Sequence, residues 1–216
     1  MMRALAGLTG AVAVVAMAGA ASAQPAERSG MARFVDRLGA GFYGGISIST
    51  FQGNDVDETM MFSNTAKASP TFGGLLTIAL EERFALQGEV AFATKGASFA
   101  DPLGTEGTIN LYYIEFPILI KFQRAFTNVA LRGYTGFAPA VMLEARIEDQ
   151  FGGLVDVSST TRGWDVGWVI AGGLGVGPLF FDLRYEVGLV SVEDGAEGGD
   201  IEAHNSVLSL LGGYAF

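Results

Sequence analysis

The sequence predicts an all-β protein, an eight-stranded antiparallel up-and-down transmembrane β-barrel. Half of the residues are hydrophobic and 17% are charged, which is a membrane-like composition. Beyond the N-terminal segment, no apolar run approaches the roughly 18 residues that a membrane-spanning helix needs. Segments of about ten residues instead alternate between apolar and polar side chains, as the strands of membrane barrels do. A closed barrel pairs every backbone group between strands, so it is the remaining way to cross a bilayer.

The first 23 residues have the layout of a secretory signal peptide. Arg3 is followed by an uncharged run over residues 4–20, and small residues stand at Ala21 and Ala23. We expect cleavage after Ala23, which sends the chain out of the cytoplasm. Residues 24–40 form a periplasmic lead-in, either flexible or as a short helix against the barrel mouth, and residues 41–216 form the barrel. The chain has no cysteine, which excludes disulfides, thiolate nucleophiles and cysteine metal sites.

Eight segments show the period of two that a strand with unlike faces requires. In each, every second residue is largely apolar, and the residues between them (the other parity) carry charged, polar or small side chains. A soluble sandwich would show water a polar outer face on most strands, so apolar faces this continuous favour a barrel in lipid. The segments are residues 41–51, 70–80, 84–95, 109–122, 128–145, 164–176, 179–191 and 207–216.

The connections between these segments alternate between short and long. The short ones are "EER", "QRAFT" and "GP", whereas the others are long and polar, such as "QGNDVDETMMFSNTAKAS" and "EDGAEGGDIEAH". Outer-membrane barrels place short turns in the periplasm and long loops outside. The long loops are acidic in a chain of net charge −10, so we expect an acidic outer rim. Such a rim argues against nucleic-acid binding. Its loops are either simply solvated, or they recruit divalent cations that bridge to lipopolysaccharide.

Several short stretches resemble the PorT-like outer-membrane β-barrel domain family. The most recognisable is Tyr-x-Glu-x-Pro-x-Leu at Tyr113, Glu115, Pro117 and Leu119, followed by Gly-x-x-Pro from residue 136 to residue 139. The resemblance covers roughly residues 40–216. It implies an eight-stranded barrel in the outer membrane of a Gram-negative-type bacterium, and it implies no particular reaction, cofactor or metal.

The side chains that are expected to point into the barrel predict a plugged, polar lumen. Eight strands enclose a space that side chains fill, and buried charges persist there when they are paired. We expect Arg132 and Arg184 each to lie between carboxylates of neighbouring strands, for example Glu115 and Glu186. A narrow gated path for small solutes is the alternative. The predicted ion-pair network comprises Glu89, Glu115, Lys121, Arg132, Glu144, Asp182, Arg184 and Glu186, with Gln87, Lys95 and Asp165 on the same parity.

One constellation suggests an enzyme. His204 and Ser206 stand two residues apart with Glu202 before them, and a His-x-Ser pair resembles that of the outer-membrane lipid A deacylases. Such a pair needs the imidazole to take the serine proton and a carboxylate to orient the imidazole. The deacylases place that acid after the serine, and no acidic residue follows Ser206. We therefore expect a structural or adhesive protein without catalytic residues, cofactor or metal, and keep a lipid-modifying hydrolase as the alternative.

The last ten residues, "VLSLLGGYAF", carry no charge and alternate. We expect them to be the closing strand, paired with residues 41–51. Tyr214 and the terminal Phe216 resemble the signature by which the outer-membrane assembly machinery recognises its clients. The expected partners are therefore outer-membrane lipid with lipopolysaccharide and, during biogenesis, that machinery. We expect the barrel to be a monomer.

Overall fold

The computed structural model describes residues 37–52, 63–100, 106–149, 151, 153–158, 161–191 and 204–216. All regular structure in these residues is β-strand, in one antiparallel sheet. No helix in this part of the chain has the length and apolar character to span a membrane. The strands are β1 (Leu38–Gln52), β2 (Ser63–Ala79), β3 (Phe84–Lys95), β4 (Ala97–Ala100), β5 (Glu106–Glu115), β6 (Ile118–Ala125), β7 (Ala130–Asp149), β8 (Leu154–Asp156), β9 (Trp164–Val176), β10 (Leu179–Gly188) and β11 (His204–Ala215).

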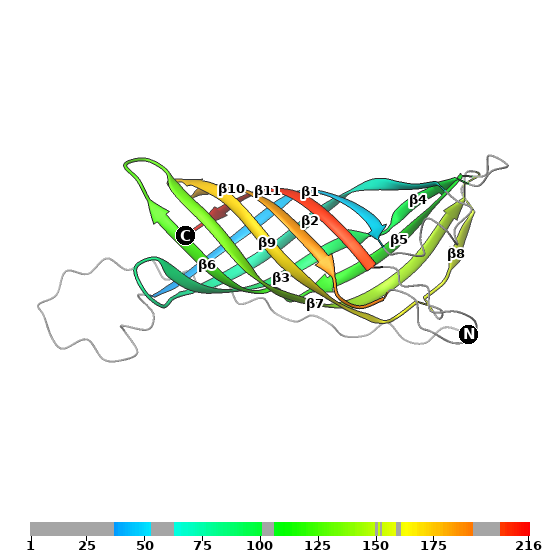
Figure 1. The fold of residues 1–216 in the computed structure, drawn as a ribbon, viewed down its shortest axis with the longest axis horizontal. Coiled ribbons are helices and arrows are strands. Elements are labelled where there is room, and N and C mark those ends of the chain that lie inside the picture. The colour runs from blue at the N-terminus through cyan, green and yellow to red at the C-terminus, as the bar shows by residue number, and fades with distance from the viewer. Residues whose placement is uncertain are drawn as a thin grey trace, which may run out of the picture.

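The sheet closes on itself. Neighbouring segments of the chain pair around the sheet: β1 with β2, β2 with β3 and β4, β3 with β5 and β6, and β5 and β6 with β7. Strand β7 then pairs with β9, β9 with β10 and β10 with β11, which returns to pair with β1 from Gly41↔Ala215 to Gln52↔His204. At the closing seam, the backbone N–H and C=O of Phe216 are both hydrogen-bonded to Ala40, at 2.8 and 3.1 Å. The paired strands wrap diagonally around a common interior (Figure 1). The expected pairing of the last segment with residues 41–51 is therefore present.

The described residues contain eleven strands, whereas the sequence analysis expected eight. The third expected strand continues past Lys95 into β4, and Gly96 interrupts the pairing with a φ of 123°, a conformation that favours glycine. The fourth is divided into β5 and β6 at Phe116 and Pro117, because proline has no N–H to give to a ladder. The short β8 pairs with the outer end of β7.

Strand lengths differ at the two ends of the barrel. The bounds of β3 and β9 coincide with the expected residues 84–95 and 164–176. Strand β2 begins seven positions earlier than the expected residue 70, and β7 continues to Asp149, so part of two expected loops is strand. Figure 1 shows β4, β5, β7 and β8 reaching one end, while the C-terminus lies at the other end with the short turns.

Polarity in this barrel is the reverse of that in a soluble protein. Large apolar side chains are exposed on the outside, among them Phe42 at 58%, Leu76 at 64% and Leu210 at 65%. The interior holds buried glutamates, aspartates, arginines and two lysines, together with apolar clusters such as Leu119, Tyr134, Ala138 and Val169. An exposed apolar band around a closed sheet is what lipid contact requires. Residues 1–36, which include the predicted signal peptide and most of the predicted lead-in, lie outside the described residues.

Candidate functional site: the interior ion-pair network

Two groups of charged side chains meet in the interior. The outer cluster is Lys95, Glu115, Asp165 and Glu186, and the inner cluster is Glu89, Arg132, Asp182 and Arg184. On β10, Asp182 and Arg184 lie nearer the short turn to β9 than Glu186 does, which places the inner cluster toward the short-turn end. All eight residues are 7% exposed or less.

The outer cluster surrounds one ammonium group with three carboxylates. The Nζ of Lys95 lies 2.6 Å from Glu186 Oε1, 2.8 Å from Glu115 Oε1 and 3.6 Å from Asp165 Oδ2. These three carboxylates come from different strands, β10, β5 and β9. The residue is 1% exposed, so its contacts with protein replace its hydration. Asn205 on β11 donates to the same Asp165 oxygen at 2.9 Å and links a fifth strand to the cluster.

The inner cluster is built around a two-pronged ion pair. Both terminal nitrogens of Arg184 donate to the two oxygens of Glu89 at 2.9 Å, the geometry in which a guanidinium binds a carboxylate most strongly. Tyr43 and Gln87 donate to the same carboxylate at 2.7 and 2.6 Å. Four donors thus satisfy Glu89. Arg184 also lies 5.4 Å from the ring centre of Tyr43.

A second pair lies beside it. Asp182 accepts a hydrogen bond from the hydroxyl of Tyr134 at 2.6 Å and lies 3.4 Å from an Arg132 nitrogen. The guanidinium of Arg132 lies 4.0 Å from the ring centre of Phe180, a cation–π distance. Rings of tyrosine and phenylalanine thus lie beside both interior guanidinium groups.

These pairs differ from the example given by sequence reasoning. The structure pairs Arg184 with Glu89 and leaves Glu115 and Glu186 to Lys95. Alternation identifies which side chains point inward, but the tilt of the strands decides which of them meet across the interior. The position of Lys95 in the alternation placed it inside the barrel, but the predicted network did not include it, although it has three ionic partners.

Glu144 lies apart from both clusters. Its side chain is 35% exposed and forms an ion pair with Arg146. The reason is a shift of register between β5 and β7, where Tyr112 faces Glu144 but Tyr113 faces Met142. A bulge of this kind adds a residue to one strand and reverses the parity beyond it. Counting alternate residues from the middle of β7 therefore assigns Glu144 to the wrong face.

Two glycines on β9 make room for the carboxylates of β10. A Cβ on Gly167 would lie 2.3 Å from Glu186 Oε1, and a Cβ on Gly173 would lie 2.1 Å from Asp182 Oδ1. Glu186 and Asp182 can therefore fold over the neighbouring strand toward their partners. The small residues of this strand were the available sequence signal for the arrangement.

Little space remains between the two clusters. A cavity of about 20 Å³ lies beside Lys95, Glu115, Arg184 and Glu186. That volume suits a single water molecule. The motif Tyr113, Glu115, Pro117 and Leu119 is also buried, so it packs the interior.

His204 and Ser206 lie at the start of β11. The Oγ of Ser206 donates to the hydroxyl of Tyr185 at 3.0 Å, and Nδ1 of His204 has no hydrogen-bond partner. Between the described residues, no hydrogen bond joins His204 to Ser206. Glu202 and the acidic loop over residues 193–203 lie outside the described residues.

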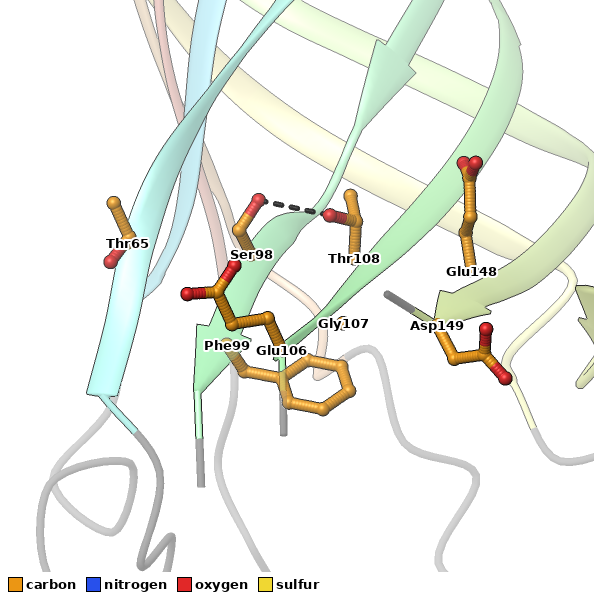
Figure 2. A pocket seen from close by; sticks show the side chains of 8 residues that line it. All are labelled: Thr65, Ser98, Phe99, Glu106, Gly107, Thr108, Glu148 and Asp149. Carbon is orange, nitrogen blue, oxygen red and sulfur yellow. Dashed lines mark hydrogen bonds between the residues drawn. The ribbon is translucent and has the colours of Figure 1, made fainter. Parts of the chain in front are cut away.

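A groove of about 600 Å³ lies at the end of the barrel where the long strands reach furthest. Figure 2 shows the hydroxyls of Ser98 and Thr108 hydrogen-bonded to each other, at 3.1 Å, with the carboxylate of Glu148 beside them. The ring of Phe99 extends below Glu106 in the same view. Among the described residues, no group of histidine, aspartate and glutamate side chains is arranged to hold a metal ion.

A closed antiparallel sheet with an apolar exterior and a charged interior defines an outer-membrane-type β-barrel. The chain belongs to the outer membrane protein beta-barrel domain family, whose model matches residues 22–194. Its place is accordingly the bacterial outer membrane. The match does not distinguish the PorT-like group that the sequence motifs resemble. No match was found among curated proteins.

Solved structures with a similar course of the chain include three small outer-membrane proteins. Ail, the attachment invasion locus protein of Yersinia pestis, is 17% identical, with 83% of this chain and 99% of that chain covered and a TM-score of 0.42. Neisserial surface protein A is 9% identical, with 82% and 97% covered and a TM-score of 0.48. OprG from Pseudomonas aeruginosa is 11% identical, with 82% and 95% covered and a TM-score of 0.48.

Proposed function

We propose that the protein is a plugged, non-conducting outer-membrane barrel with a structural or adhesive role. The observation that carries the proposal is the set of ion pairs across the interior. Lys95 reaches Glu186 over 91 positions of sequence, and Arg184 reaches Glu89 over 95. With about 20 Å³ left between the clusters, a hydrated solute has no path past them.

The proposal includes an eight-stranded barrel of the PorT-like group. We count β3 with β4 as one segment, β5 with β6 as another, and β8 as part of a loop. This count gives eight transmembrane segments, and both the first and the last of them end on the short-turn side. The burial of the Tyr-x-Glu-x-Pro-x-Leu motif supports the group assignment, because it gives the motif a packing role in the interior. We also propose that the barrel is a monomer.

Conductance in planar bilayers tests the plug. The purified wild-type barrel is expected to give no discrete current steps at high protein load. Replacing both partners of the inner ion pair, with Glu89→Ala and Arg184→Ala, removes two large side chains without leaving one charge unpaired, and is expected to produce small steps. Regular current steps from the wild type would favour the alternative of a minor channel for small solutes.

The outer end is the proposed contact surface. The groove beside Ser98, Thr108 and Glu148 offers hydroxyl and carboxylate groups (Figure 2). Carboxylate oxygens are ligands for hard divalent cations, and such cations bridge to lipopolysaccharide phosphates. The proposed partners are outer-membrane lipid with lipopolysaccharide and, during insertion, the assembly machinery. We do not propose nucleic acid as a partner.

We further propose that the barrel is not a lipid hydrolase. Ser206 gives its hydroxyl hydrogen to Tyr185, whereas a nucleophilic serine gives it to a base. Purified barrel incubated with lipopolysaccharide is expected to release no fatty acid above the level of a Ser206→Ala variant. Release that depends on Ser206 and also on His204 would restore the enzymatic alternative.

A further inference from the structure

The short-turn mouth of the barrel contains a cation that the ion-pair network does not use. Lys121 on β6 is 8% exposed and belongs to the interior parity. Among the described residues, it has no side-chain hydrogen bond or ion pair. Its ammonium group therefore differs from that of Lys95, which has three carboxylates around it.

The two carboxylates of the inner cluster bind donors other than Lys121. Glu89 accepts four hydrogen bonds from Arg184, Tyr43 and Gln87, whereas Asp182 binds Tyr134 and Arg132 through Oδ2 and its Oδ1 has no hydrogen-bond partner. Lys121 interacts electrostatically with Glu89, Arg132 and Asp182, and it adds a third positive charge to a cluster of two carboxylates and two guanidinium groups. A buried charge without a partner is unfavourable, so this mouth is electrostatically suited to an anion.

A space for an anion is present. A pocket of about 240 Å³ opens at this mouth and is lined by Lys121, Gln123 and Thr77. Alanines at positions 79, 85 and 125 also line it, and their small side chains leave the mouth hollow. The volume is below the roughly 300 Å³ at which sites for drug-sized ligands begin, so the ligand is small.

The rim of the pocket narrows the choice of anion. Glu81 and Glu82 lie in the turn between β2 and β3 together with Arg83, and all three line the pocket. Two rim carboxylates beside one guanidinium disfavour polyanions, whereas a single carboxylate can reach the ammonium within. Short turns face the periplasm in this class of barrel, so the ligand comes from that side.

We propose that the periplasmic mouth is a binding site for a small carboxylate-bearing ligand, with the ammonium of Lys121 as its charged anchor and Gln123 and Thr77 as polar neighbours. The carboxylate belongs to a free molecule of the periplasm.

Lysine-selective NMR of the mature barrel in detergent micelles tests the proposal. The lysines of the chain are Lys67, Lys95 and Lys121, so the other two serve as internal controls. Titration with acetate, against sodium chloride at equal ionic strength, is expected to shift the Lys121 Cε signal saturably and leave those of Lys67 and Lys95 in place. Lys121→Met assigns the signal, and in Lys121→Gln the saturable shifts of neighbouring backbone amides are expected to disappear.

The proposal is overturned if the wild type does not respond to acetate beyond the chloride control, or if the amide shifts persist in Lys121→Gln. Heat-modifiable migration in detergent gels checks that each variant is folded.

Discussion

At the scale of single residues, the interior depends on charges that satisfy one another. Lys95 is the clearest case, because three carboxylates from three strands converge on one ammonium group. Removing one member of such a group raises the free energy of the folded state by more than forming the group lowers it, since the remaining charges cannot regain water. The side chain therefore specifies how the strands face each other more than it adds net stability.

Lys95→Met is accordingly expected to destabilise the barrel by about 3–5 kcal/mol, the range for removing one partner of a buried ion pair. The measurement is the urea midpoint of unfolding in detergent, followed by tryptophan fluorescence. Adding Glu186→Gln to this variant should recover part of the loss, because it removes one of the orphaned charges. Lys67→Met is the matched control, since Lys67 bonds to Asn110 and is incompletely buried. Equal losses in Lys95→Met and Lys67→Met would contradict this account.

At the scale of strands, the alternation of side chains predicted much of what is observed and failed at identifiable places. The ends of β3 and β9 coincide with the expected residues because polar turns or a break at Gly96 follow them directly. The outer ends of β2 and β7 were missed, since a strand above the membrane no longer needs an apolar face. The bulge opposite Tyr112 moved Glu144 outside, and no local sequence signal marks that shift.

The candidate site was predictable to a similar extent. Parity identified Glu89, Arg132, Asp182 and Arg184 as interior residues, and their burial agrees with that position. Their partners were not predictable, because the contact between Arg184 and Glu89 joins strands that are distant in sequence and depends on strand tilt. The absence of an ion pair at Lys121 was likewise not predictable, because it depends on which groups Glu89 and Asp182 bind instead.

Strand β9 offers a test of how small residues shape the interior. Gly167→Ala would place a Cβ 2.3 Å from Glu186 Oε1 and displace that carboxylate from Lys95. We expect a loss of roughly 1–3 kcal/mol, typical of overpacking. Gly172→Ala on the same strand meets just one backbone oxygen, at 3.8 Å, and should be neutral or slightly stabilising. The measurement is the urea midpoint of unfolding of each variant. A lower midpoint for Gly172→Ala than for Gly167→Ala would refute this role for Gly167.

At the scale of the whole molecule, the seam between β1 and β11 completes the closed sheet. The backbone of Phe216 exchanges two hydrogen bonds with Ala40, while the residue is 72% exposed and its ring lies 6.2 Å from that of Tyr214. The backbone therefore contributes to closure, and the exposed ring is the part that the proposed recognition by the assembly machinery would use.

Two variants separate these roles. Deleting Phe216 should impair outer-membrane insertion and leave export to the periplasm intact, because both the ring and the two seam bonds are lost. Phe216→Ala keeps the backbone bonds, so purified Phe216→Ala protein should refold in detergent like the wild type while inserting poorly in cells. Cell fractionation and heat-modifiable migration measure the two outcomes. Normal insertion of Phe216→Ala would show that the ring is not a recognition element.

The ion pairs across the interior also bear on the order in which the barrel is made. Glu89 and Lys95 lie on β3, but their partners Arg184 and Glu186 lie on β10, more than ninety positions later. A growing sheet of early strands must therefore keep these charges hydrated until the late strands arrive. Contacts between such distant positions form slowly. Release of water from the interior and arrival of the last strands should then be a single late event, which makes closure of the barrel the slow step of its assembly.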